Sequence, residues 1–316
     1  MNTQLRWQSV AKGLGTLVPV VSTLANSAAG SPVSARYFYS VWLRHLVSIA
    51  SVRPRFSYEV VAELGPGDAL GMGICALLSG ARRYIGLDRI AFGPRADNLR
   101  LLDELQALFK VRTPIPDDQE FPGVYPKLEM YAFPGNVVTD DMLAVSLAPR
   151  QLARLRAALQ GELHFSEDSL FSYAAPWDAS ERVRPGSVDL LVSQAVLEHV
   201  DDVDGAYRAM HRWLKADGVM SHRIDYTCHG ITRDWYGHWT VSTGLWRIVR
   251  GKRAYLINRL PHSAHIAAMR RNGFEIVDCA PTPSSPAAPA GNLRIAHIAS
   301  DLAIKGAFVV AQPTAQ

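Results

Sequence analysis

Two acidic residues and a glycine-rich bend stand at the ends of the first two predicted strands. Residues 58–64 alternate in polarity and run into Glu63-Leu-Gly65-Pro66-Gly67-Asp68. Glycine lets the backbone turn sharply and approach a ligand with no Cβ in the way. Asp88 follows Gly65 by 23 residues, at the end of the second predicted strand. An acid at that point can accept hydrogen bonds from the hydroxyls of an adenosine ribose.

The residues around the bend distinguish between nucleoside cofactors. A dinucleotide fingerprint requires a third glycine, but position 70 is Leu. Glu63, two residues before the first glycine, is poorly suited to a pyrophosphate and well suited to a ligand that carries an ammonium and a sulfonium. A phosphate-binding Gly-x-x-x-x-Gly-Lys-Ser/Thr loop does not occur. We therefore expect S-adenosylmethionine (SAM) as the cofactor, bound by Glu63, Gly65, Pro66, Gly67, Asp88 and Arg89.

Five of the ten histidines lie between residues 222 and 265, around the end of the fifth predicted strand. Strand alternation places His222 on one face and Asp225 on the other, so His222 is expected to pack in the interior. Transfer of a methyl group to a hydroxyl needs a general base, commonly His or Asp. We expect His229 to be that base, oriented by Asp225, with His199 as the next candidate.

The same histidines raise the question of a metal. His222, Asp225 and His229 are legitimate ligand types. Their spacing matches no strong zinc pattern, however, and we predict no metal site.

Residues 226–273 form a basic and aromatic stretch. They hold eight Lys or Arg against one acid, a charge of +7 that leaves −3 for the rest of the chain. Cationic and aromatic side chains together are typical of a contact surface for an anionic, sugar-like or planar partner. We expect an acceptor to bind here, through Trp235, His238, Trp239 and Arg250. The alternative is a solvated basic loop whose tryptophans lie in the core.

Strands and helices alternate along most of the chain. Strands are predicted at 58–64, 84–87, 169–174, 188–192, 219–224, 274–279 and 306–312, and helices at 37–49, 69–80, 97–110, 150–159, 203–214 and 262–272. This order predicts a Rossmann-like α/β fold: a doubly wound, mainly parallel seven-stranded sheet with helices on both faces. Ligands of such sheets bind outside the carboxyl ends of the strands.

The expected organisation is an N-terminal helical extension (1–57), one SAM-binding domain (58–312) and a short tail (313–316). Residues 111–167 form a proline-rich insertion that we expect to act as a lid, and 226–261 form the acceptor segment. A Pro/Ala/Ser linker is expected at 281–291.

Composition excludes several classes of protein. The chain has 316 residues, of which 48% are hydrophobic and 20% charged, as in ordinary globular proteins that bury a core. Three widely spaced cysteines argue against a disulfide scaffold and fit a reducing compartment, so we expect a cytoplasmic protein. The uncharged stretch 13–35 imitates a signal peptide. A packed extension is the preferred interpretation, and peripheral membrane contact stays open, whereas a spanning helix is not expected.

Taken together, these motifs resemble class I SAM-dependent methyltransferases, in the type-11-like branch. The resemblance rests on residues 58–110 and 168–312, including the stretch Val188-Asp-Leu-Leu-Val-Ser-Gln-Ala-Val-Leu-Glu-His-Val200. It implies that the loop at Tyr173–Trp177, with Ala174 and Ala175, contacts adenine. It also implies that Ser193 and Gln194 contact the methionine end of SAM. A narrower similarity, to uncharacterised bacterial methyltransferases associated with surface-polysaccharide genes, is carried by Ser221–His229, Trp235–Trp239 and Asn258-Arg259.

The expected activity is methylation of a small molecule or glycan, at a hydroxyl oxygen. RNA ribose methylation, a non-catalytic SAM-binding module and an NAD enzyme are the alternatives. Nucleic acid is disfavoured, because the Asn/Asp-Pro-Pro-aromatic and Pro-Cys motifs of base methyltransferases are absent from the sequence.

Overall fold

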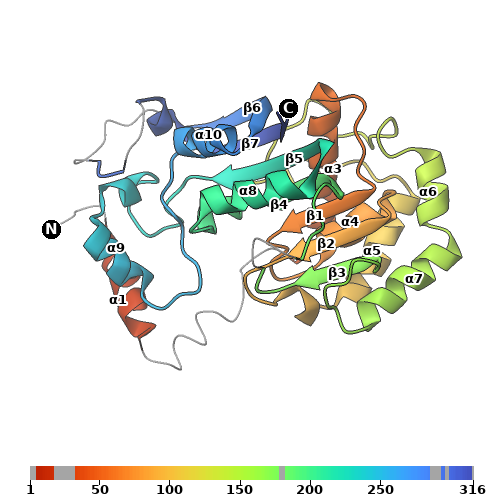
Figure 1. Cartoon of the computed structure of the whole chain (residues 1–316), viewed down its shortest axis with the longest axis horizontal. Coiled ribbons are helices and arrows are strands. Elements are labelled where there is room, and N and C mark those ends of the chain that lie inside the picture. Colours follow the sequence, from red (N-terminus) through yellow and green to blue (C-terminus); the bar gives the residue numbers. More distant parts are fainter. Residues whose placement is uncertain (1–4, 18–32, 178–181, 285–292, 296–298, 315–316) are drawn as a thin grey trace.

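A single seven-stranded sheet organises the computed structural model, which describes residues 5–17, 33–177, 182–284, 293–295 and 299–314 (Figure 1). The strand order is β3-β2-β1-β4-β5-β7-β6. Pairing is parallel from β3 to β5, while β7 runs antiparallel to both β5 and β6. The strands are β1 (Val60–Leu64), β2 (Arg83–Leu87), β3 (Phe171–Ala174), β4 (Val188–Gln194), β5 (Leu214–Asp225), β6 (Phe274–Pro283) and β7 (Ile304–Pro313). The doubly wound fold predicted from the sequence is confirmed.

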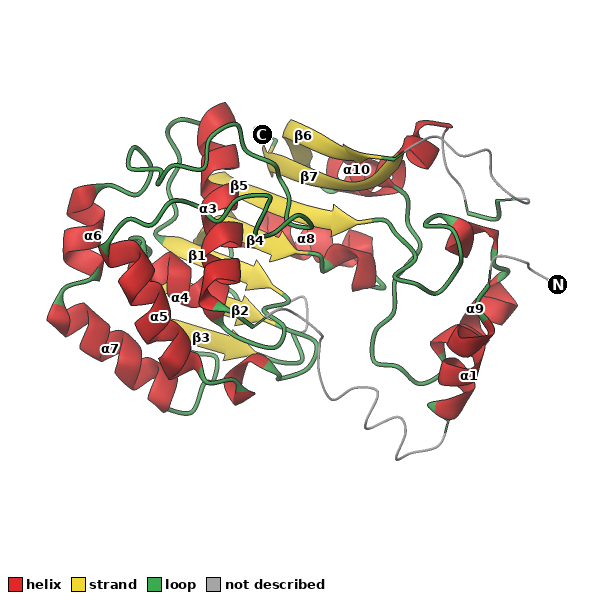
Figure 2. Ribbon diagram, turned by 180° about the vertical axis from the view of Figure 1, so that it is seen from behind, coloured by secondary structure: helices red, strands yellow, loops and turns green. Residues whose placement is uncertain are grey.

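Helices cover both faces of this sheet, as parallel strands require. One face carries α3 (Ala35–Val52), α4 (Gly71–Leu78) and α5 (Asn98–Lys110), which pack on one another (Figure 2). The other face carries α8 (Val203–Trp213) and α10 (His262–Arg271). Two large apolar clusters, one on each face, form the core.

The predicted elements are present with shifted ends. Strand β5 begins at Leu214, earlier than expected, because Leu214 pairs with Val188 across an irregularity in the ladder. Strand β6 continues to Pro283 along β7, so the expected linker begins later and the rest of it lies largely outside the described residues. Short helices that the sequence analysis did not predict are α1 (Trp7–Gly15), α6 (Asp140–Ser146) and α9 (Thr243–Arg250).

The insertion 111–167 wraps around α3 and adds α6 and α7 (Pro149–Gln160). Its anchor is Arg44 of α3, whose side chain is fully buried. The guanidinium donates hydrogen bonds to the carbonyls of Pro116, Val124 and Pro126 and pairs with Asp118 at 3.1 Å. Four points of the insertion are thereby held by one side chain.

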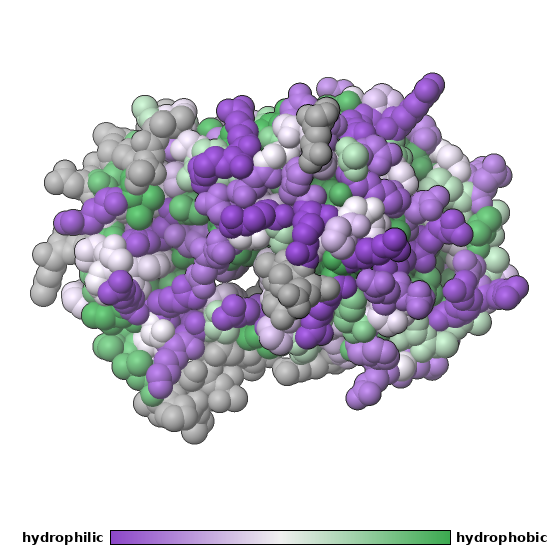
Figure 3. All heavy atoms as spheres, viewed as in Figure 1, coloured by the Kyte–Doolittle hydropathy of each residue, from purple (hydrophilic) through white to green (hydrophobic). Residues whose placement is uncertain are grey.

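A satellite of two helices lies away from the sheet. Helix α1 packs on α9, where Gly13 lies against the backbone of Ile248 and Val249. The exposed apolar side chains of α1 include Trp7 at 67% and Leu14 at 50%. Hydrophobic residues are visible on the surface at the left of Figure 3, the side on which Figure 1 shows α1 and α9. Among the described helices, none is both long and apolar enough to cross a membrane. Most of the uncharged stretch 13–35 lies outside the described residues.

The anchoring role of Arg44 predicts a large loss of stability on substitution. Arg44→Met should lower the free energy of unfolding by about 3 kcal/mol, because buried carbonyls and Asp118 lose their donor. Urea denaturation measures this. Arg36→Met is the matched control: Arg36 sits on the same helix and pairs with Glu120 of the same insertion, but at an exposed position. Its loss should cost less than about 1 kcal/mol. Equal losses in both variants would contradict the anchoring role.

Candidate active site

A cavity of about 330 Å³ lies at the carboxyl ends of β1, β2 and β4, where the fold places ligands. Its lining comes from the bend after β1, the ends of β2 and β4, the first turn of α8, and the loop after α9. Of the predicted cofactor residues, it includes Gly65, Gly67, Asp88, Arg89 and Gln194. No residue of the insertion 111–167 lines it, so the insertion is not placed as a lid in this structure.

The bend after β1 depends on glycine for a steric reason. Gly65 and Gly67 have φ of +67° and +72°, in the left-handed region. A Cβ on Gly65 would lie 2.6 Å from the side chain of Val196, in the loop after β4. The Gly65 amide donates to the carbonyl of Leu87 at 2.8 Å. The bend therefore lets the ends of three strands converge on one cavity.

Asp88 joins the ends of β1, β2 and β3 by hydrogen bonds. Its carboxylate accepts hydrogen bonds from the amides of Gly67 (2.9 Å) and Arg89 (2.7 Å). Its own amide donates to Ala174, and its carbonyl accepts from the amide of Trp177. Burial raises the pKa of Asp88 to about 6, against the effect of these amides. The carboxylate is thus fixed in position at the wall of the cavity.

Glu63 is placed differently from Asp88. It is 3% exposed and accepts a 2.5 Å hydrogen bond from the hydroxyl of Tyr84 on β2. Burial raises its pKa to about 8. Glu63 and Pro66 are absent from the cavity lining, so Glu63 stands behind the bend as a buried, mainly protonated group at neutral pH.

The remaining predicted cofactor residues also divide into those that line the cavity and those that lie behind it. Trp177 lines the cavity, whereas Ala174 and Ala175 support its loop from behind. Gln194 lines the cavity and hydrogen-bonds Nε2 of His45 at 3.3 Å. Ser193 is fully buried and hydrogen-bonds His222, which is packed in the interior as expected.

The three predicted catalytic residues lie together beside the cavity. Nε2 of His229 is 3.5 Å from a carboxylate oxygen of Asp225, and the rings of His199 and His229 are 5.1 Å apart. His199 lines the cavity. Burial lowers the pKa of His199 to about 4. Burial also disfavours the charged form of His229, but the hydrogen bond and charge of Asp225 outweigh it and raise its pKa.

A fourth polar residue, Glu198, belongs to this cluster and was missed by sequence reasoning. It lies on the short helical turn Leu197–His199, is 3% exposed, and neither of its carboxylate oxygens has a hydrogen-bond partner in the described part of the chain. Burial raises its pKa to about 8. Its position next to His199 in the sequence was the available signal, but nothing local indicated that it would turn inward.

Most of the basic and aromatic segment packs behind the cavity wall and does not line the cavity. Trp239 is fully buried and His238 is 1% exposed, so neither ring presents a face for stacking in this structure. Trp235 packs edge-on against Trp239. Arg250 makes a bidentate pair with Asp201, which lines the cavity. From this region only Ala254 and Tyr255 line the cavity, and the sequence analysis named neither.

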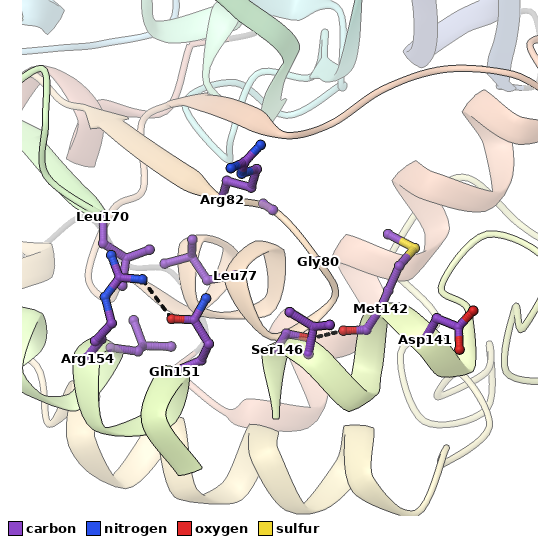
Figure 4. Close-up of a pocket in the computed structure, with 12 residues that line it drawn as sticks. Leu77, Gly80, Arg82, Asp141, Met142, Ser146, Gln151, Arg154 and Leu170 are labelled. Carbon is purple, nitrogen blue, oxygen red and sulfur yellow. Dashed lines mark hydrogen bonds between the residues drawn. The ribbon is translucent and has the colours of Figure 1, made fainter. Parts of the chain in front are cut away.

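A second, larger hollow of about 750 Å³ lies at the opposite edge of the sheet, between α4, α6 and α7 (Figure 4). Arg154 and Ser146 of its lining are hydrogen-bonded locally. The Arg154 guanidinium donates to the side chain of Gln151, and the Ser146 hydroxyl donates to carbonyls of Met142 and Leu78. It contains none of the residues predicted for chemistry, so we place the active site at the smaller cavity.

The residues at the smaller cavity fit SAM. Gly65 and Gly67 present bare backbone at the cavity wall, the fixed carboxylate of Asp88 suits ribose hydroxyls, and among the described residues the lining has no phosphate-binding lysine. Residues 131–221 match the family model described as a methyltransferase domain, a span that contains β3, β4 and part of β5. This match covers less than a third of the chain; together with the doubly wound sheet, it supports a class I SAM-dependent methyltransferase, an enzyme whose cofactor is SAM.

Solved structures similar to this methyltransferase are distant in sequence. A putative SAM-dependent methyltransferase from Listeria monocytogenes is 15% identical, with 86% of this chain and 99% of that chain covered and a TM-score of 0.42. A SAM-dependent methyltransferase from Methanosarcina mazei is 12% identical (84% and 98% covered, TM-score 0.45). Phosphoethanolamine N-methyltransferase 2 from Haemonchus contortus, in complex with SAM, is 13% identical (90% and 61% covered, TM-score 0.43). No curated protein matches the chain.

Asp88 predicts a direct test of cofactor binding. Asp88→Ala should weaken SAM binding about ten- to hundred-fold, because charge-assisted hydrogen bonds to ribose and the fixed bend at Gly67 are lost together. Isothermal titration calorimetry with SAM measures the change. Asp217→Ala, at an exposed position on β5, is the control and should bind as the wild type does. Unchanged affinity in Asp88→Ala would exclude this carboxylate from the cofactor site.

Glu63 predicts a pH dependence of stability. Its pKa in the folded protein, about 8, lies above the ordinary value of 4.5. The folded state therefore holds a proton that the unfolded chain releases, and stability falls as pH rises from about 4.5 to about 8. Without SAM, Glu63→Gln should reduce that fall by about 1–3 kcal/mol. Urea denaturation at pH 5.5 and pH 8 measures it, with exposed Glu59→Gln as control. An unchanged slope in Glu63→Gln would show that Glu63 is ionised when buried.

Proposed function

We propose that this methyltransferase transfers the methyl group of SAM to a hydroxyl oxygen of a small-molecule or glycan acceptor. The observation that carries the proposal is the cluster of His229, Asp225 and His199 beside the SAM cavity. A hydroxyl must lose its proton as its oxygen is methylated, and proton-accepting groups near the transferred methyl contribute about 10²–10⁴-fold to such a reaction.

SAM, when bound, supplies a sulfonium-activated methyl group. Asp88 and the bend at Gly65–Gly67 orient the nucleoside end, and Gln194, at the end of β4, lines the same cavity. His199 lines the cavity, and its ring is 5.1 Å from the ring of His229. Asp225 is ionised, with a pKa of about 2, because its hydrogen bonds to His229 and the Thr227 amide outweigh the effect of burial. The Asp225 carboxylate thereby holds His229 in place to take the proton of the acceptor hydroxyl.

The charge of the lining supports a neutral acceptor over RNA. Among the described residues, the charged groups of the lining are Asp88, Asp201, Asp202 and Arg89, and Arg250 pairs with Asp201 from outside the cavity. This wall offers no cluster of cations to the phosphates of RNA. The cations of the basic segment are in part engaged elsewhere: Arg250 pairs with Asp201, and Arg259 donates to the carbonyl of Val241 and stacks on Trp246. Tyr255, whose ring is 5.7 Å from that of His199, offers an aromatic surface at the cavity for a sugar ring.

The acceptor class can be tested with methyl-labelled SAM and a fractionated bacterial extract. Label should enter the glycan or small-metabolite fraction and be stable to conditions that cleave esters, as an ether is. His229→Ala should lower kcat about 10²–10⁴-fold and leave the Kd for SAM unchanged.

His164→Ala provides the matched control, because the His164 side chain is exposed and its one described hydrogen bond is to the carbonyl of Glu162. It should be labelled at the wild-type rate. Label found in RNA, or full activity in His229→Ala, would contradict the proposal.

A further inference from the structure

Glu198 presents a physical problem that the methyltransferase reaction alone does not solve. Its carboxylate is buried, and neither oxygen has a hydrogen-bond partner within the described residues. Nδ1 of the adjacent His199 is also buried and without a partner. Buried polar groups are nearly always paired, and an unpaired buried carboxylate is among the most costly. Unpartnered atoms on two adjacent residues indicate a missing ligand.

The geometry around Glu198 is that of a cation site. One ligand atom each from Glu198, His199 and His229 lie within 4.8 Å of one another. Ligands bound to one ion at about 2.1 Å lie within about 4.2 Å of each other, twice the bond length. Small side-chain rotations are therefore enough to bring the three atoms onto one ion. The ligands come from two places, the turn after β4 and the turn after β5.

Both turns are fixed by backbone and side-chain contacts. The amide of Asn258 donates to the carbonyl of Glu198, and its side-chain amide donates to the carbonyls of Leu197 and Val200. His229 has φ of +47° and is followed by Gly230 at +74°, which makes a tight turn at the end of β5. Ligands held by rigid supports are what a preformed metal site requires.

The charges around the cluster also favour a cation. Glu198 and Asp225 both act electrostatically on His229, and their negative charges raise the pKa of its imidazole. Arg223 is the nearby positive group, but its guanidinium donates to the carbonyls of Ile224 and Ala307 and stacks on Tyr125. Its hydrogen bonds are thus directed to backbone, and the Glu198 carboxylate is left without a donor.

We propose that Glu198, His199 and His229 bind a divalent transition-metal cation of the Zn²⁺ type. Two imidazoles and one carboxylate are a ligand set typical of catalytic zinc, which keeps a position open for a further ligand. The proposal rests on the proposed function and changes the role of His229 in it. A ring nitrogen bound to the ion takes no proton, so the ion would itself ease the loss of the acceptor proton by binding the acceptor oxygen at its open position, and His229→Ala would act through loss of the ion. It replaces the expectation of no metal, which considered the set His222, Asp225 and His229.

The site is tested with the full-length protein after chelator treatment and removal of any affinity tag. Zn²⁺ should bind with 1:1 stoichiometry in calorimetry, and Co²⁺ should give visible absorption bands of a protein-bound ion. Glu198→Gln and His199→Asn should each weaken Zn²⁺ binding at least about ten-fold. His164→Ala should bind as the wild type does, because His164 lies outside the cluster.

Several results would overturn the site. These are no saturable Zn²⁺ uptake by a folded wild-type protein, wild-type affinity in both Glu198→Gln and His199→Asn, or uptake of Mg²⁺ in preference to Zn²⁺. Circular dichroism establishes that each variant is folded, and Glu198→Gln keeps the side-chain volume.

The metal inference and the proposed function fail in distinguishable ways. Methylation of a hydroxyl acceptor at full rate in excess chelator, by protein that binds SAM, would remove the metal site and leave the function. Tight Zn²⁺ binding that depends on Glu198, with label found only on nitrogen or carbon acceptors, would retain the site and remove the hydroxyl acceptor.

Discussion

The hydrogen bond from the Gly67 amide to the Asp88 carboxylate is the interaction on which the cofactor site depends. It connects the bend after β1 to the end of β2, and the backbone of Asp88 extends the connection to the β3 loop through Ala174 and Trp177. Only a bare backbone at Gly65 lets the β4 loop close on the same point, since Val196 occupies the space of a Cβ. Three loops from distant parts of the sequence thus share one cavity wall.

Burial of carboxyl groups is the second theme of the site. Glu63 satisfies its buried carboxyl with the Tyr84 hydroxyl and a retained proton. Asp88 uses backbone amides and remains at the cavity. Glu198 also has a pKa raised to about 8 by burial, but its carboxyl oxygens have no hydrogen-bond partner within the described residues. Three acids of similar burial therefore have different chemistry, because a carboxyl group takes its character from the donors around it.

The basic and aromatic segment has a structural role that composition concealed. Asn258 fixes the turn that carries Glu198 and His199, while Arg250 holds Asp201 at the cavity. Trp239 fills the interior of the segment. The sequence analysis interpreted the cations and tryptophans of this segment as an acceptor surface. In the structure, Arg250 and Trp239 instead support the cavity wall and fill the interior of the segment. The insertion 111–167 is similarly structural, since Arg44 ties it to α3 on the far side of the sheet from α8.

The sequence by itself determined the strand–bend–helix order, the glycines at 65 and 67, the acid at 88 and the grouping of His199, Asp225 and His229 near strand ends. These follow from local rules, because periodicity and turn residues act over a few positions. Only the tertiary structure decided that Trp239 would be buried, that Glu63 would face Tyr84, and that Glu198 would lack a partner. Whether a side chain is exposed, paired or orphaned depends on what packs against it from remote parts of the chain. For Glu198 that neighbour is the turn at His229, 31 residues further along.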